Sequence, residues 1–477
     1  MTLLGPGSVR HACLFLELTG LEQFIAASYG SQQKVSVAIE QSAVDFGKKE
    51  TERMAEGMAP KEISTCQDET FHPETCLVAI EPVANFILLE AYADGRKGSD
   101  WTKAMDEALK DLPVKVIQST SDYGTGIVHH VKNDLGAHHS PDVFHSQHEV
   151  VKATSAVLAS KTKKAQKDLE KASEAVNRRI DQQVAYENNG PRRGRAPQFD
   201  KRIESALGKE TEALNTLEAA KSHQKRMHDA IRGIGDAYHP VDLETGKLRD
   251  TQQVAGALNR CFNEIETVAC QAQLSDASFK RITKARKTVV DMIATIAFFL
   301  FTVRAKIEAL SLAPTVETAV LEILIPALYI RQAADKAKTA EVRHRLRAKS
   351  DEMLNSLNGD NTSFAGVTED ELAVIERVAQ ECAGLFQRSS SNVEGRNGQL
   401  SLWHHGLHRL SNRKLSALTV VHNFFIKRRD GTTAAERFFG KKPKDLFEFL
   451  LEKVDLPGRP AKKRHALKEK ISIIVGA

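Results

Sequence analysis

Apolar residues recur at intervals of three and four over most of this chain, which is the spacing of an amphipathic helix. The pattern runs through Val35–Met54 near the N-terminus and through almost all of residues 147–387. Between these regions it changes to short apolar runs bounded by turn residues, which predicts strands. The sequence therefore predicts a protein that is mostly helical and contains one small sheet.

The predicted strands lie in a single stretch of the chain. They cover Ile63–Gln67, Cys76–Glu81, Phe86–Tyr92, Val114–Gln118 and Asp142–His145. The first three follow one another closely, which predicts an antiparallel meander, and helices are expected over Trp101–Leu112 and Gly124–Leu135. Three antiparallel strands followed by alternating strands and helices are typical of a mixed sheet covered by helices.

Two long polar helices are expected in the helical region, over Lys152–Arg179 and Asp200–Arg232. A loop rich in Gly and Pro separates them, so they are predicted to pair as an antiparallel coiled-coil arm. Further helices are expected over Thr251–Leu310, Glu317–Leu357 and Thr368–Gln387. The longest apolar run, Met292–Val303, is shorter than the roughly 20 residues that a membrane-spanning helix needs. It is therefore predicted to be a buried helix, and no membrane partner is expected.

The charge is uneven along the chain. The whole sequence has a formal net charge of +5. Residues 389–477 contain 18 Lys and Arg against 8 Asp and Glu, a net charge of +10, which leaves −5 for residues 1–388. A basic C-terminal segment indicates a polyanionic partner such as nucleic acid, although a solvated basic surface has the same composition.

Cysteine usage and the N-terminus predict a cytoplasmic protein. Six cysteines in 477 residues are too sparse for a disulfide framework, and the absence of a Cys-x-x-Cys pair makes a zinc ribbon unexpected. No basic segment followed by a long apolar run begins the chain, so no signal peptide is expected. The glycine patterns of P-loops and Rossmann folds are also missing, so nucleotide-driven chemistry is not expected.

Three acidic residues occupy positions from which they could meet. Asp68 follows the first predicted strand, Asp122 follows the strand Val114–Gln118, and Glu394 lies in Ser-Asn-Val-Glu-Gly-Arg-Asn. Carboxylates at the ends of neighbouring strands can converge at one edge of a sheet. Mg²⁺ prefers such oxygen ligands, and two ions about 3.5–4 Å apart can activate the attacking oxygen and stabilise the leaving oxygen of a phosphodiester. An acid after a strand is more often a turn residue or a helix cap, so position alone does not decide its role.

The segments around these acids resemble bacterial insertion-sequence transposases of the DDE type. The resemblance is carried by residues 67–90, 118–122, 136–149, 391–410 and 421–440, the last of which belongs in such proteins to a C-terminal domain without an assigned activity. The helical region fits as an insertion before the third acid.

This resemblance implies an α/β fold with a mixed-sheet RNase H-like core and a large all-α insertion. It implies that Asp68, Asp122 and Glu394 are the catalytic acids and hold two Mg²⁺ (or Mn²⁺) ions. The reaction would be DNA cleavage at insertion-sequence ends followed by strand transfer, with double-stranded DNA as the partner and a homo-oligomer that holds two ends. The expected domains are an N-terminal helical segment over 1–60, a core over 61–150 and 388–430, a helical insertion over 151–387 and a basic segment over 431–477.

Basic and polar residues near the third acid are candidates for DNA contacts. Arg396 and Asn397 follow Glu394 and could bind a phosphate or orient the acid. The other candidates are Arg409, Arg413, Lys414, Lys427, Arg428 and Arg429. Mixtures of aromatic and basic residues, as in residues 403–414, bind phosphates and stack on bases, although the same residues could belong to the core.

Several alternatives remain open. Glu149 is a rival third acid because it follows the last predicted strand without an insertion. His145 and His148 are spaced to share a metal, although polar surface histidines have the same spacing. Such transposases often carry an N-terminal helix-turn-helix, which the residues before Asp68 do not clearly contain. The competing interpretations are an inactive transposase-derived DNA-binding or scaffolding protein and a plain helical interaction protein in which the acids never meet.

Overall fold

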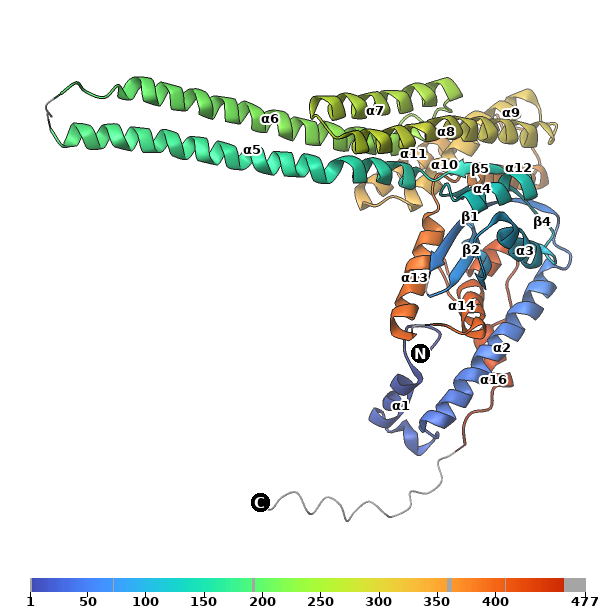
Figure 1. Ribbon diagram of the computed structural model, residues 1–477. Coiled ribbons are helices and arrows are strands. Elements are labelled where there is room, and N and C mark those ends of the chain that lie inside the picture. Colours follow the sequence, from blue (N-terminus) through green and yellow to red (C-terminus); the bar gives the residue numbers. More distant parts are fainter. Residues whose placement is uncertain (1, 72, 191–193, 358–362, 408, 459–477) are drawn as a thin grey trace, which may run out of the picture. The chain divides into compact units, whose positions relative to one another are not determined.

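The computed structural model describes residues 2–71, 73–190, 194–357, 363–407 and 409–458. The chain separates into two compact units, the first formed by residues 1–139 and 390–477 and the second by residues 140–389 (Figure 1). Most of the chain is helical, and the strands form one mixed sheet of five. The prediction of a helix-dominated protein with a small mixed sheet is confirmed.

The sheet has the strand order β3-β2-β1-β4-β5. The strands are β1 (Lys61–Phe71), β2 (Thr75–Glu81), β3 (Phe86–Ala93), β4 (Val114–Ser121) and β5 (His138–Pro141). β1, β2 and β3 form an antiparallel meander, whereas β1 and β4 run parallel. β1 is therefore the central strand, and β3 lies at an edge.

Helices cover both faces of this sheet in the first unit. The longer ones are α1 (Val9–Leu18), α2 (Tyr29–Ala55), α3 (Gly98–Leu109), α13 (Ser391–Leu407), α14 (Asn412–Phe424) and α16 (Leu446–Lys453), and the shorter ones include α4 (Thr125–His129) and α15 (Ala434–Phe439). Leu77 of β2 belongs to a hydrophobic cluster with Trp101 of α3. Its neighbour Val78 belongs to a second cluster, with Val393 and Leu400 of α13. Because side chains alternate along a strand, both faces of the sheet are buried.

The segment after residue 430 contributes to the core of the first unit. Phe438 stacks on Phe86 of β3 with ring centroids 4.5 Å apart. Phe46 of α2 contacts Phe424 of α14 at 5.6 Å and Phe449 of α16 at 5.2 Å. Aromatic packing thus joins α15 and α16 to the sheet, while the residues after 458 lie outside the described part of the chain.

The second unit is helical. Its helices include α5 (Val143–Asn188), α6 (Phe199–Ala237), α7 (Thr251–Gln271), α8 (Asp276–Glu308), α9 (Pro314–Ala319), α10 (Ile325–Asp335), α11 (Ala340–Asn355) and α12 (Glu369–Leu385). α5 and α6 lie side by side (Figure 1). Thr162 bonds to Gln224 at 3.1 Å, and Tyr186 contacts Phe199 with ring centroids 5.2 Å apart. α5 and α6 therefore run in opposite directions, as an antiparallel arm requires.

α8 contains the longest apolar run of the sequence. Its buried residues include Met292, Ile296, Phe299 and Val303, which share one side of the helix. By length and composition α8 could also cross a membrane, and 33% of its most apolar window is buried. Core helices of soluble proteins meet the same criterion, so the expectation of no membrane partner stays a prediction.

The last strand was predicted in the wrong place. β5 covers residues 138–141, and residues 142–145 are not a strand. The Asp142 carboxylate accepts a hydrogen bond from the backbone N–H of Phe144 at 2.6 Å, which caps the N-terminus of α5. The residues from Val143 onward therefore form the first turn of a helix.

Two predicted helices are interrupted. The helix expected over Gly124–Leu135 consists of α4 followed by a π-helical turn at His130–Asp134. The helix expected over Thr251–Leu310 is divided into α7 and α8, because the side chain of Ser275 caps a new helix by accepting from Ser278 N–H.

Candidate metal centre

Asp68 lies within β1, and Asp122 directly follows β4, the strand that pairs in parallel with β1. The β1–β4 pairing runs as far as Cys66 opposite Thr120, and each aspartate lies two residues beyond that pair. Because side chains alternate along a strand, both aspartates project on the face that carries Cys66. Both are half-buried. The structure thus places the two acids that the sequence singled out on neighbouring strands, but the prediction that Asp68 follows the first strand is wrong, because β1 continues to Phe71.

Glu394 comes to the same face on α13. Asn397 of this helix donates a hydrogen bond from Nδ2 to Oδ2 of Asp68 at 2.9 Å. Glu394 lies three residues before Asn397 and therefore one turn away on the same side of the helix. Val393 packs in the hydrophobic cluster that contains Cys66, which fixes this part of α13 on the sheet. The third acid therefore lies on the face of the sheet that carries both aspartates.

Local hydrogen bonds orient the two aspartates. Oδ1 of Asp68 accepts from the backbone N–H of Glu69 at 2.8 Å. Oδ1 of Asp122 accepts from the backbone N–H of Gly124 at 2.9 Å, which fixes the turn after β4. A backbone N–H of the following one or two residues thus orients each carboxylate. The second carboxylate oxygen of Asp68 accepts a hydrogen bond from Asn397.

The donor atoms at this face suit a hard divalent cation. Asp68, Asp122 and Glu394 offer carboxylate oxygens, and Oδ1 of Asn397 is a buried amide oxygen without a hydrogen-bond partner among the described residues. Such an atom costs free energy unless an ion or water satisfies it. Where the chain is described, the ligand atoms of the three acids do not all lie within 4.8 Å of one another. A single ion held directly by all three acids is therefore not what this arrangement shows.

Glu69 adds a fourth carboxyl group, on the opposite face of β1 from Asp68. Its Oε1 accepts from Trp101 Nε1 at 3.3 Å, and its Oε2 accepts from Arg96 at 3.4 Å. Burial raises the pKa of Glu69, and the charge of Asp122 adds to this rise against the opposing effect of Trp101 and Arg96. Sequence reasoning missed Glu69 because nothing local distinguishes it from other acids on a strand.

The histidines between residues 129 and 148 divide between the two units. In the first unit, Nε2 of His139 lies 2.9 Å from Oγ of Ser121, directly before Asp122, and His139 is buried. In the second unit, Nδ1 of His145 lies 3.5 Å from Oδ2 of Asp142. His139 thus contacts the residue that directly precedes Asp122.

The alternative ligands near the start of α5 have contacts within the second unit. His148 stacks on Phe144 with ring centroids 5.7 Å apart. Glu149 lies 3.7 Å from Lys152, one turn further along the helix. These contacts are ordinary for a helix surface, and they give no support to Glu149 as the third acid.

Arg396 is buried, so the prediction that it contacts DNA is wrong. Its Nε and Nη2 donate to the two carboxylate oxygens of Glu90 at 2.6 and 2.7 Å, and its side chain is 7% exposed. Thr419 of α14 donates to the same carboxylate at 2.6 Å. Burial alone would lower the pKa of Arg396, but Glu90 holds this pKa above its usual value, so the guanidinium stays charged. Arg396 therefore attaches α13 to β3.

Lys414 also packs inside the first unit. Its side chain is 13% exposed and lies over the ring of Trp403, with Nζ 5.3 Å from the ring centroid. Burial lowers the pKa of Lys414, against the opposing charge of Glu40. Trp403 itself is buried. This part of the aromatic and basic segment is therefore core rather than a surface that stacks on bases.

The other predicted DNA contacts are more accessible. Arg413 pairs with Glu40 at 3.1 Å, and Arg409 pairs with Glu74 at 3.0 Å. Lys427, Arg428 and Arg429 are all exposed. Exposed basic residues can reach a phosphate backbone, so DNA contact by these residues stays a prediction.

Comparison with known proteins adds a family without an assigned function. The model of a family of unknown function (DUF6399) matches residues 320–466. This region begins near the end of the second unit and continues through α13, so it contains Glu394 and Asn397 but neither Asp68 nor Asp122. No curated protein and no solved structure matches this chain.

Proposed function

We propose that this chain is a DNA transposase whose first unit is an RNase H-like nuclease core. The observation that carries the proposal is the hydrogen bond from Asn397 to Asp68, because it brings α13 and Glu394 to the strands that bear both aspartates. The order of elements along the first unit supports the proposal, because three antiparallel strands followed by alternating helices and strands agree with the mixed-sheet core that the resemblance to DDE transposases implies.

The chain's own residues have distinct roles in this proposal. Asp68, Asp122 and Glu394 would hold two Mg²⁺ ions, and Oδ1 of Asn397 would face the same ligand set. Bound Mg²⁺ would supply activation of the attacking oxygen and stabilisation of the leaving oxygen. Asn397 orients the Asp68 carboxylate through Nδ2. Arg396 is a positioning residue, because it fixes the helix that carries Glu394.

The reaction needs no covalent protein intermediate. In the first step, water attacks a phosphodiester at the end of the element, the P–O3′ bond breaks, and the 3′ oxygen leaves as a hydroxyl. In the second step, this hydroxyl attacks a phosphodiester of target DNA, a P–O bond forms to the 3′ oxygen of the element, the P–O3′ bond of the target breaks, and the target's 3′ oxygen leaves as a hydroxyl. Both steps are substitutions at phosphorus, so one set of carboxylates serves both.

A nicking assay with a matched acidic control tests the proposal. The substrate is DNA that carries the sequences flanking the gene of this chain, incubated with Mg²⁺ or Mn²⁺. The wild-type protein and Asp106→Asn, which alters an exposed acid of α3, are expected to nick it. Asp122→Asn is expected to bind the DNA but leave it intact, because a metal ligand is lost. Nicking by Asp122→Asn at the wild-type rate would refute the assignment.

A second candidate is a DNA-binding protein derived from such an enzyme. It is favoured by the spread of the three acids, whose ligand atoms do not all lie within 4.8 Å in the part that the structure describes. This candidate predicts DNA binding without nicking in either metal. Titration with Mn²⁺ separates the two, since an inactive scaffold would show no tight Mn²⁺ site that depends on Asp122.

A further inference from the structure

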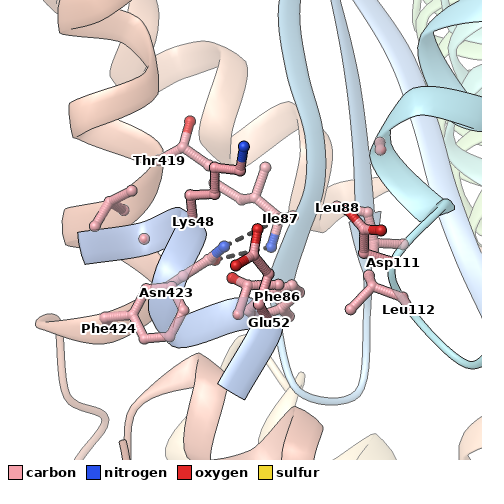
Figure 2. Close-up of a pocket in the computed structure, with 14 residues that line it drawn as sticks. Lys48, Glu52, Phe86, Ile87, Leu88, Asp111, Leu112, Thr419, Asn423 and Phe424 are labelled. Carbon is pink, nitrogen blue, oxygen red and sulfur yellow. Dashed lines mark hydrogen bonds between the residues drawn. The ribbon is translucent and has the colours of Figure 1, made fainter. Parts of the chain in front are cut away.

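A groove follows the outer edge of β3, the last strand on its side of the sheet. A cavity of 630 Å³ lies along residues 88–94 between α3 and α14. A second cavity of 230 Å³ continues it past Ile87 towards α2 (Figure 2). The two cavities share Leu88, Ala108, Thr419 and Val420, and together they are called the β3 groove below.

At one point of the groove, a side chain already pairs with the edge of β3 as a strand would. Oδ1 of Asn423 accepts from the backbone N–H of Ile87 at 2.9 Å, and Nδ2 donates to the Ile87 carbonyl at 3.0 Å (Figure 2). For residues 89–93, the described chain contains no backbone hydrogen bond to any element other than β2. An edge strand with outward-facing peptide groups is a template for an added strand.

Small side chains keep this edge approachable. α3 presents Ala104 and Ala108 to the groove, α14 presents Ser416, and β3 itself presents Ala91 and Ala93. The volume of the larger cavity falls within the range of about 300–1,000 Å³ that is usual for ligand sites. The walls therefore leave room for a peptide backbone beside β3.

The groove is acidic. Besides Glu90, which Arg396 neutralises, its lining contains two lysines and five acids, which are Lys48, Lys103, Glu52, Asp94, Asp100, Glu107 and Asp111. Beside the groove, Nζ of Lys110 donates a hydrogen bond to Oε1 of Glu107 at 3.2 Å, and this bond together with the charges of Glu107, Asp111 and Glu52 raises the pKa of Lys110. This net negative charge repels phosphate and attracts Lys and Arg.

We propose that the β3 groove binds an extended basic peptide segment as an added strand. The peptide backbone would pair with residues 89–93, and its Lys or Arg side chains would reach the carboxylates of α3 and α2. Hydrogen bonds to the backbone supply affinity in this mode, and the charges supply specificity. The proposal does not depend on the nuclease function, because it uses none of the residues of the metal centre.

Fluorescence anisotropy with the full chain and a labelled probe peptide tests the proposal. The probe is the blocked heptapeptide Lys-Thr-Lys-Val-Lys-Thr-Lys. One control peptide replaces each Lys with Glu, and a second carries N-methyl groups on alternate peptide bonds, which prevents pairing with a strand edge. Only the unmodified basic peptide is expected to bind. Equal binding of either control peptide would overturn the proposal.

Variants of the chain locate the site on the protein. The double variant Glu107→Lys with Asp111→Lys is expected to bind the probe about tenfold more weakly, since two attractive pairs become repulsive. Asp106→Lys makes the same kind of substitution on the exposed surface of α3 outside the groove, with a charge change of +2 against +4 for the double variant, so its affinity should stay at the wild-type value. Ala104→Trp should block binding while the circular dichroism of the chain is unchanged. Wild-type affinity in folded Ala104→Trp, or equal losses in Asp106→Lys and the double variant, would refute this location.

Discussion

Replacement of Arg396 by Met is expected to destabilise the first unit strongly, although the residue lies on a helix beside the sheet. The substitution keeps most of the apolar length of the side chain and removes the guanidinium. Among the described residues, the carboxylate of Glu90, whose side chain is fully buried, then keeps only the hydrogen bond from Thr419. Removing one partner of a buried ion pair costs about 3–5 kcal/mol, because the other charge stays buried without compensation.

The size of the first unit determines how far this loss of unfolding free energy lowers the midpoint of thermal unfolding. For a unit of 150–250 residues, each 1 kcal/mol shifts the midpoint of thermal unfolding by about 2–4 °C, so a decrease of about 6–20 °C is expected. The chain has two tryptophans, Trp101 and Trp403, and both lie in the first unit. Tryptophan fluorescence therefore reports the unfolding of this unit without a contribution from the second.

Two further variants separate the ion pair from the general effect of losing an arginine. Arg409→Met removes a pair with Glu74 in which both side chains are about half exposed, so its cost should stay below about 1 kcal/mol. Arg396→Met combined with Glu90→Leu removes both buried charges and should recover most of the stability. The reasoning fails if Arg396→Met costs less than Arg409→Met, or if the double variant is no more stable than the single one.

Two other predictions concern acid sensitivity and metal binding. His239 is buried between Tyr329 and Arg388, with both contacts at 2.6 Å, and burial followed by the charge of Arg388 holds its pKa well below the usual value. The unfolded chain takes up this proton below about pH 6.5, so calorimetry should show the second unit losing up to about 1.4 kcal/mol per pH unit between pH 6.5 and 5. His239→Gln should reduce that slope, and an unchanged slope would contradict the explanation. Asn397→Ala should weaken Mn²⁺ binding about tenfold or more in an EPR titration, because Asp68 loses its orienting partner. Leu402→Ala, on the exposed side of α13, should bind Mn²⁺ as the wild type does, and equal affinity in both variants would exclude a role for Asn397.

The sheet was predictable where local sequence determines it. In β2 the apolar residues Cys76–Ile80 are buried on both faces, and the turn that follows ends at Asn85, which adopts the left-handed φ of 60°. The turn residues themselves favour such a connection, and His422 and Arg437 from the far end of the chain add hydrogen bonds to the carbonyls of Asn85 and Ala84. The same reasoning assigned Asp68 and Asp122 to neighbouring strands, although it ended the first strand before Asp68 whereas β1 continues to Phe71.

β5 and the start of α5 could not be predicted in the same way. His138–Pro141 has no apolar alternation, and its residues are ordered by pairing with β4. Directly afterwards, Val143 and Phe144 look like strand residues. The hydrogen bond that the Asp142 side chain accepts from the Phe144 N–H instead begins a helix of 46 residues. The Asp142 cap therefore makes Val143 and Phe144 helical, although their composition favours a strand.

The role of Arg396 could be predicted from the sequence even less than the start of α5. Its partner Glu90 lies 306 residues earlier in the chain, and neither residue has a local feature that points to the other. A basic residue near a candidate acid fits a phosphate contact equally well on sequence alone. Only the packing of α13 against β3 distinguishes a buried ion pair from a DNA contact.

The rotation of α13 decides whether the third acid reaches the other two. Val393, Arg396, Leu400 and Trp403 are spaced by three and four residues, and all four are buried against the sheet. Because successive residues of a helix are about 100° apart, Glu394 lies at the margin of this buried stripe, which accounts for its partial burial. A rotation that exposed Arg396 would also separate Asn397 from Asp68. The buried ion pair therefore holds the helix in the one rotation that keeps Glu394 on the face of the two aspartates.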